Sequence, residues 1–298
     1  MGKRDVERAF LISLLATTIM GSSQLIFSFI FNSLALLALG LETLSDSVTT
    51  VVAIWGTRVS RRPADRGHPY GHWQAESLVS LFLALALGIS GLRVLISSVD
   101  RLRAGTVPGI TPEAILVPAV SASVCLTLAL YKLRVGRREG SLPLVSDAYH
   151  TLTDFLTSTS AGLGLAAVHA GYPAADPAVA MAISFLLFYL SFSIGRASVS
   201  LLMERAAPEQ MISEMKSICR QTPGVRGFHK LRTRRSGSKI FADVHVLVDQ
   251  DKSVREAHEI ASKLERRLKS KIHGLSSVVV HVEPERRPKS STSRKERS

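Results

Sequence analysis

The chain has 298 residues, of which 46% are hydrophobic and 20% charged, and its formal net charge is +13. Its two cysteines are too few for a disulfide framework or a thiolate zinc site. Apolar residues dominate the first two thirds of the chain and basic residues its end, which predicts a membrane domain followed by a soluble one. We attribute the positive charge to cytoplasmic loops and a lipid-contacting tail, and we expect no nucleic-acid partner.

Six apolar segments are each long enough to cross a bilayer as a helix. They comprise residues 10–31, 34–58, 75–99, 112–133, 144–168 and 177–203. The charged start leads into the first segment without a cleavage signal, so we expect a retained helix and not a signal peptide.

Basic residues concentrate at the N-terminus and in alternate connections, which places both termini in the cytoplasm. They are Lys3, Arg4 and Arg8 at the start, Arg58, Arg61, Arg62 and Arg66 in the second connection, and Lys132, Arg134, Arg137 and Arg138 in the fourth. The third connection, with Arg101 and Arg103, is an exception to this alternation.

The soluble part is predicted to be a small α+β domain over residues 204–284, following a membrane domain over 1–203. A helix begins after Pro208, and strands are expected over 225–234 and 239–249. Ser253 and Glu256 form a capping box that starts a second helix, and a valine-rich strand follows over 275–283. The α-β-β-α-β order suits a small domain that gains stability by dimerising. Residues 285–298 are expected to be a disordered basic tail.

Two of the apolar segments carry acids in their interior. Glu42 and Asp46 lie four residues apart in the second segment, and His150 and Asp154 lie four apart in the fifth. Residues at this spacing share one face of a helix. An acid at the centre of a membrane span costs about 2.5–3.5 kcal/mol, so two such pairs need a partner, a cavity or a cation.

Oxygen and nitrogen ligands from two helices suit a tetrahedral divalent ion such as Zn²⁺. The alternative is a hydrogen-bond network that only packs the bundle. Asp147, one turn before His150, is either a spare ligand or, as we favour, a hydrogen-bond partner behind the ligands.

The same residues suggest coupling between metal and protons. Two carboxylates about 4 Å apart repel by about 4 kcal/mol at an effective dielectric constant of about 20. An empty site is therefore expected to hold protons, which a metal ion displaces because its ligands must be deprotonated. If the site opens alternately to each side of the membrane, this competition becomes proton-coupled exchange.

Two further sets of metal-type ligands lie outside the apolar segments. Asp65, His68 and His72 fall in one polar loop, where the alternative is incidental surface histidines. The second set lies in the soluble domain, where the alternative is scattered surface histidines, and comprises His229, His245, His258, His281 and Glu283. His281 and Glu283 are two apart on a predicted strand and therefore point the same way.

These motifs resemble the cation diffusion facilitator family over nearly the whole chain. "SLALLALGLETLSD" is similar to the family's second span, "SDAYHTLTD" to its fifth, "RPADRGHPYGHWQAES" to its cytoplasmic loop, and "PGVRGFHKLRTRRSGSKIFADVHV" to its soluble domain. The resemblance implies six transmembrane helices and a metallochaperone-like, ferredoxin-like cytoplasmic domain. It also implies a homodimer that exports a divalent metal from the cytoplasm in exchange for protons.

By the same resemblance, the bacterial zinc and ferrous-iron efflux branch is the most similar subgroup, which implies the bacterial inner membrane. The transport site then falls on Glu42, Asp46, His150 and Asp154. The loop set matches a second metal site, and the soluble set matches a site at the dimer interface. Glu42 and Glu283 depart from the branch's usual residues, and Gln74 stands where a lysine can pair with an acid near Glu204.

Zn²⁺ is the expected cargo, with Fe²⁺, Co²⁺, Cd²⁺ or Mn²⁺ as alternatives. His150 favours zinc or iron over manganese, because imidazole suits zinc and iron whereas oxygen ligands suit manganese. A membrane scaffold or metal sensor that binds metal without moving it is the alternative from another class. An enzyme is not expected, because the sequence has no nucleophile–base set, phosphate loop or HExxH motif.

Overall fold

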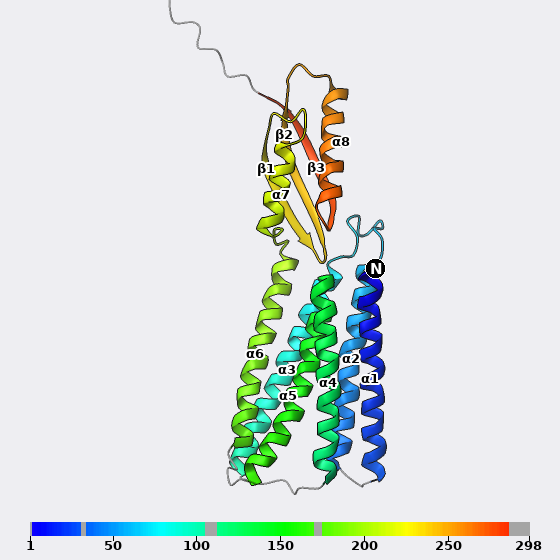
Figure 1. Ribbon diagram of the computed structural model, residues 1–298, viewed down its shortest axis with the longest axis vertical. Coiled ribbons are helices and arrows are strands. Elements are labelled where there is room, and N and C mark those ends of the chain that lie inside the picture. Colours follow the sequence, from blue (N-terminus) through cyan, green and yellow to red (C-terminus); the bar gives the residue numbers. More distant parts are fainter. Residues whose placement is uncertain (1, 31–33, 105–111, 170–174, 286–298) are drawn as a thin grey trace, which may run out of the picture. The chain divides into compact units, whose positions relative to one another are not determined.

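The computed structural model describes residues 2–30, 34–104, 112–169 and 175–285. It separates into two compact units, residues 1–203 and 204–298, which we describe one at a time (Figure 1). The predicted basic tail lies outside the described residues from position 286 onward.

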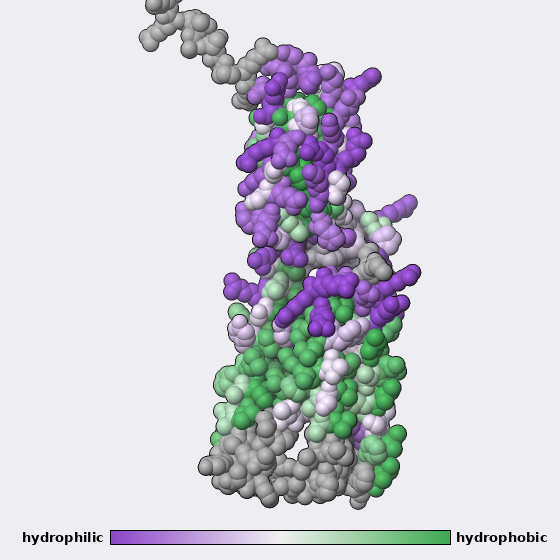
Figure 2. All heavy atoms as spheres, in the orientation of Figure 1, coloured by the Kyte–Doolittle hydropathy of each residue, from purple (hydrophilic) through white to green (hydrophobic). Residues whose placement is uncertain are grey.

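The first unit is a bundle of six helices that pack mainly in pairs, α3 with α6, α4 with α5 and α1 with α2. They are α1 (Gly2–Ile30), α2 (Leu34–Ser60), α3 (Ala75–Ala104), α4 (Pro112–Glu139), α5 (Leu142–His169) and α6 (Ala175–Leu202). Apolar side chains cover much of this unit on the face shown in Figure 2. So large an exposed apolar surface requires lipid or another protein around it.

Within the described residues, four helices are long and apolar enough to cross a membrane by length and composition. Their spans are Arg4–Ile30, Ala75–Arg103, Ala119–Glu139 and Pro177–Leu202. The helices α2 and α5, which carry the acids, are not among these four. The prediction of a helical membrane domain is confirmed, and six crossings remain a proposal.

The helices extend beyond the predicted apolar segments. The helix α4 runs to Glu139, so Lys132, Arg134 and Arg137 lie in a helix and not in a connection. Lys132 is also fully buried and cannot count as a loop charge. The reason is that hydropathy marks only the apolar part of a helix, whereas its backbone hydrogen bonds continue into polar residues. The connection to α5 is only Gly140 and Ser141, and Gly140 adopts a φ of +65° typical of a helix-ending glycine.

The second unit is a three-stranded sheet covered on one face by two helices. Its elements are α7 (Glu209–Arg220), β1 (Gly227–Ser236), β2 (Lys239–Val248), α8 (Val254–Lys271) and β3 (Leu275–Pro284). The predicted α-β-β-α-β order and the capping box are confirmed. The strands β1 and β2 pair antiparallel and β2 and β3 parallel, in the order β1-β2-β3.

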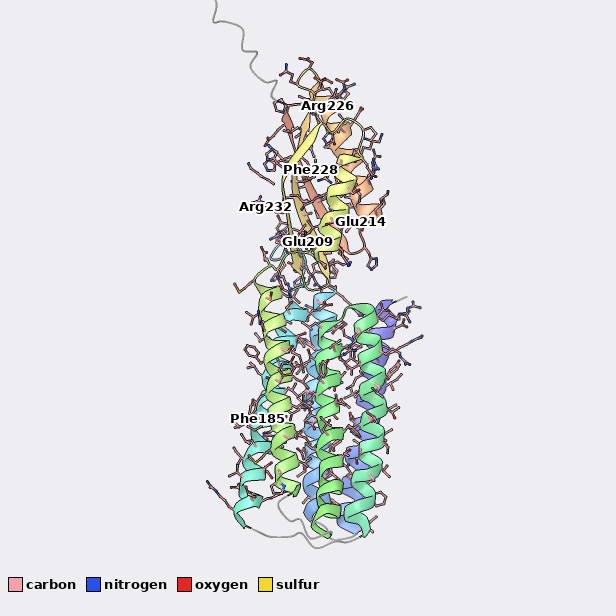
Figure 3. The ribbon with its side chains drawn as sticks, turned by 60° about the vertical axis from the view of Figure 1, so that its left-hand side comes forward. Phe185, Glu209, Glu214, Arg226, Phe228 and Arg232 are labelled. Carbon is pink, nitrogen blue, oxygen red and sulfur yellow. The ribbon has the colours of Figure 1, made fainter. Side chains whose placement is uncertain are left out.

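Alternation along the strands separates a core face from an open face. Val244 and Val246 of β2 are buried against Leu264 of α8 and Met215 of α7. The helix α7 lies over β1, from which Phe228 packs against the same core (Figure 3). Because side chains alternate along a strand, His245, between the two valines, faces away from the helices. The open face of the sheet therefore carries the polar residues of the predicted site.

Candidate metal sites

The helices α2 and α5 bring three predicted ligands together. One ligand atom from each of Asp46, His150 and Asp154 lies within 4.8 Å of the others. The Nε2 of His150 lies 3.0 Å from Oδ1 of Asp46. His150 is buried, and its Nδ1 has no hydrogen-bond partner among the described residues. Two carboxylates and an imidazole at this spacing can bind a divalent transition metal.

Glu42, the fourth predicted ligand, is not part of this group. It is exposed and lies one turn before Asp46 on α2. The helix spacing predicted that the two acids share a face, but it did not predict how closely α5 approaches each turn. Among the described residues, α2 makes hydrogen-bonding contacts with α5 at Asp46 and at Thr50, which lies one turn beyond Asp46 on the side away from Glu42.

Behind the ligand group lies a buried ion pair that involves a residue absent from the predicted site. Lys132 of α4 donates to Oδ2 of Asp147 at 2.8 Å, and Thr50 of α2 donates to Oδ1 of Asp147 at 2.9 Å. The Lys132 and Asp147 side chains are 0% and 1% exposed. These contacts support the interpretation of Asp147 as a hydrogen-bond partner and not as a ligand.

A signal for Lys132 was present in the sequence. Ala122, Cys125 and Ala129 precede it at steps of three and four residues, and all four side chains are buried. This spacing marks one helix face turned toward the interior. Following this helical period to the end of the apolar segment 112–133 would have placed Lys132 inside the bundle.

The loop between α2 and α3 brings Asp65, His68 and His72 together. Asp65 accepts hydrogen bonds from the backbone N–H groups of His68 and Gly67, at 2.7 and 2.9 Å. The first of these, followed by the second, lowers the pKa of Asp65 below its ordinary value. The Nε2 of His72 lies 3.3 Å from Oδ2 of Asp65. This exposed loop holds its carboxylate ionised beside two imidazoles, as a metal site requires.

Gln74, just beyond this loop, stands at the position where the resemblance implies a lysine. Its amide donates to the backbone carbonyl of Leu201 at 3.5 Å. In the second unit, Glu204 instead accepts from Arg234 at 2.6 Å.

The open face of the sheet gathers a third group, His229, His245 and Glu283. Glu283 accepts from Nδ1 of His245 at 2.6 Å and from Nε2 of His229 at 2.9 Å. His281 is next to the group, with its ring centroid 4.6 Å from that of His245 and its Nε2 3.6 Å from Glu283. The strand register brings the three histidines side by side, because His245 of β2 pairs with His229 of β1 and with His281 of β3.

Two irregularities adjust the geometry of this face. The pairing of β1 with β2 shifts between His229 and Arg232, and Lys230 inside that bulge adopts a φ of 50°. A bulge changes the direction of neighbouring side chains.

His258, the fifth predicted member of this group, is exposed on α8 and lies 3.4 Å from the hydroxyl of Ser262. Because α8 covers the opposite face of the sheet, a single chain does not bring His258 to the group.

The pKa of Glu283 makes the stability of this unit depend on pH at acid values. Hydrogen bonds from His245 and His229 hold the pKa of Glu283 down to about 2, against an ordinary value of 4.5. A depressed carboxyl pKa stabilises the fold at pH values above 4.5, and this stabilisation is lost as the pH falls toward about 2. We expect that metal-free residues 204–298 carrying Glu283→Gln lose less stability between pH 4.5 and about 2 than the unmodified unit does. Acid unfolding followed by circular dichroism measures this difference.

The same substitution is expected to weaken Zn²⁺ binding by this unit, measured by calorimetry at pH 7. Removing a residue that hydrogen-bonds to a metal ligand lowers the metal affinity by roughly 10–100-fold. The Zn²⁺ affinity of Glu283→Gln should fall by at least as much. Glu265→Gln is the matched control, because Glu265 is an exposed acid that pairs with Lys269 on α8. Equal Zn²⁺ affinities for the two variants would contradict a metal site on this face.

An apolar helical bundle with clustered carboxylate and imidazole ligands between two of its helices defines an integral membrane protein that handles metal cations. The sequence profile of the cation efflux transmembrane domain matches residues 10–203, and that of the cation efflux protein cytoplasmic domain matches residues 207–285. The chain therefore belongs to the cation efflux family, the cation diffusion facilitators.

Relatives of this chain come from archaea, bacteria and plants. An uncharacterized transporter of Methanocaldococcus jannaschii is 28% identical over 280 residues, which cover 94% of this chain and 99% of the relative. The manganese efflux system protein MneS of Bacillus subtilis is 29% identical, covering 93% of this chain and 95% of its own. The cation-efflux pump FieF of Cronobacter sakazakii is 28% identical, covering 94% and 93%. The chain is accordingly a divalent-cation efflux transporter and not an enzyme.

Proposed function

We propose that this protein exports Zn²⁺ from the cytoplasm through the Asp46, His150 and Asp154 group. The observation that carries the proposal is the imidazole of His150, buried between two carboxylates from facing helices. Imidazole favours zinc and iron over manganese, for which oxygen ligands are preferred. Glu42, one turn before Asp46 on α2, is the fourth ligand in this proposal, which requires its side chain to turn toward the group.

Export is proposed to be coupled to protons. Neighbouring carboxylates repel when both are ionised, so the empty group takes up protons. A divalent ion displaces them, because metal ligands must be deprotonated. Alternating exposure of the group to the two sides of the membrane then exchanges metal for protons.

The proposed setting is a homodimer in a bacterial inner membrane, with all six helices spanning it and both termini in the cytoplasm. Basic residues support the orientation, because Arg58, Arg61 and the 2–8 segment lie at one end of the bundle. The open histidine-bearing face of the sheet supports the dimer, since a second copy would cover it. We propose that the loop group and the sheet group are additional Zn²⁺ sites, with His258 and His281 completing the latter in the dimer.

Manganese is the second candidate cargo, because two relatives carry the name of a manganese efflux system protein. Ferrous iron, Co²⁺ and Cd²⁺ share the preference for nitrogen-containing sites and remain alternatives. A scaffold or sensor that binds metal without moving it would need no ligands between α2 and α5, and their presence there favours transport.

Transport by the purified full chain in proteoliposomes tests the proposal. Zn²⁺, anaerobic Fe²⁺, Mn²⁺ and Cd²⁺ are added in turn, while metal uptake and the pH on the far side are recorded. We expect Zn²⁺ to move fastest and to drive protons the opposite way. If Mn²⁺ moves faster than Zn²⁺, the proposal that Zn²⁺ is the cargo is wrong. Metal binding without transport would identify the protein as a sensor.

A further inference from the structure

Two neighbouring turns of α2 meet two neighbouring turns of α5. In the first contact, Asp46 meets His150 at 3.0 Å, and in the second, Thr50 donates to Asp147 at 2.9 Å. Thr50 lies four residues after Asp46 and Asp147 three before His150, so the second contact is one turn from the first. Side chains three or four apart on a helix are about 5–6 Å from each other at Cβ. Asp147 is therefore a buried carboxylate close to the ligand group, and it is not part of that group.

Each carboxylate oxygen of Asp147 accepts a hydrogen bond inside the bundle. Thr50 occupies Oδ1, and the Lys132 ammonium occupies Oδ2 at 2.8 Å. Lys132 also donates to the backbone carbonyl of Asp147 at 3.4 Å and to the hydroxyl of Thr151. An ammonium has three hydrogens, and all three have acceptors here. Lys132 thus fixes both the charge balance and the direction of the Asp147 side chain.

We propose that Lys132 is a positioning residue that holds Asp147 away from the transported metal and so sets the metal preference. The proposal rests on the proposed function and deepens it. With Asp147 withheld, the ligands gathered in the structure are one imidazole and two carboxylates, to which the proposed function adds Glu42. With Asp147 released, a further carboxylate joins it, and the balance of ligands moves toward oxygen. Oxygen-rich sites favour Mn²⁺ over Zn²⁺.

The choice of an ion pair at this position supports a role beyond stability. Buried ion pairs are often no more stabilising than apolar residues of similar size, because both charges lose their hydration. An apolar residue at position 132 would leave the Asp147 carboxylate without the Lys132 ammonium. The carboxylate would then be free to turn toward another cation. The nearest such cation would be a metal bound by Asp46, His150 and Asp154.

Competition between Mn²⁺ and Zn²⁺ for the full chain tests this inference. Bound Mn²⁺ is followed by electron paramagnetic resonance while Zn²⁺ is added, and only binding that is lost in an Asp154→Ala background is counted. We expect Lys132→Met to raise the affinity for Mn²⁺ relative to Zn²⁺ by about tenfold, the lower end of the change in metal affinity that loss of a residue behind the ligands causes. Lys132→Met/Asp147→Leu should return the ratio to that of the unmodified chain, and Lys132→Arg should keep it there.

A role for Lys132 in packing alone would change both affinities by the same factor, which would overturn the inference. A shifted ratio that persists in the double variant would also overturn it, because Asp147 would then not be the cause. If Lys132→Met is not recovered folded, Thr50→Val releases one oxygen of Asp147 and should shift the ratio in the same direction by less. An unchanged ratio in Thr50→Val would then be decisive against it.

The binding assay separates this inference from the proposed function. A chain that moves no metal in proteoliposomes contradicts export, whereas the binding ratio still reports on Lys132. A chain that exports Zn²⁺ but shows an unchanged ratio in Lys132→Met contradicts only the inference.

Discussion

Replacing Asp154 by alanine is expected to abolish metal-driven proton movement in proteoliposomes while leaving the chain folded. Asp154 contributes one of three ligand atoms that lie within 4.8 Å of one another. In the proposed mechanism, its removal takes away a metal ligand and a proton acceptor together. Loss of a partner outside the ligands already costs about 10–100-fold in affinity, and loss of a ligand should cost at least as much.

Asp100→Ala is the matched control, because it removes an exposed carboxylate near the end of α3, outside all three groups. Metal uptake and the pH of the vesicle interior are measured for both variants at equal protein content. Undiminished flux in Asp154→Ala would show that the metal crosses elsewhere, and the transport-site assignment would have to be abandoned.

The largest effect on stability is expected from breaking the pair between Lys132 and Asp147. Asp147→Leu leaves the Lys132 ammonium buried without its counter-charge, and removing one partner of such a pair costs about 3–5 kcal/mol. The double variant Lys132→Met/Asp147→Leu removes both charges and should recover most of this loss. Thermal unfolding in detergent, followed by size-exclusion chromatography of the surviving fraction, measures the difference.

The exposed pair between Glu7 and Arg58 provides the comparison. The Glu7 and Arg58 side chains are 36% and 61% exposed, and Oε1 of Glu7 lies 2.6 Å from a terminal guanidinium nitrogen of Arg58. Exposed pairs contribute about 0–1 kcal/mol, so Glu7→Gln should leave the unfolding temperature almost unchanged. Similar losses in Glu7→Gln and Asp147→Leu would mean that Lys132 and Asp147 are hydrated in solution and not buried as a pair.

Much of the architecture was predictable because it depends on local periodicity. Apolar length marks helices that can enter a membrane, and four of the six are confirmed on that criterion. Alternation along 239–249 and 275–283 predicted strands, and it also placed His281 and Glu283 on one side of the sheet. Helix ends were predicted less well, since charged residues such as Arg137 continue a helix as readily as they end one.

The candidate sites show where local periodicity stops being sufficient. A spacing of four predicted that Glu42 and Asp46 share a face of α2, but only Asp46 lies within the ligand group. Likewise, His258 is a plausible ligand by residue type, and its helix covers the face of the sheet opposite to Glu283. Residue type identifies possible ligands, and the packing of one element against another selects among them.

The sequence by itself determined the class of protein, the two units and which side chains could bind a metal, because these follow from composition and from the fixed periods of helix and strand. Only the tertiary structure decided which of those side chains meet and that Lys132 holds Asp147. Such contacts join residues far apart in the chain, and they depend on how closely and at which turn α2, α4 and α5 approach one another.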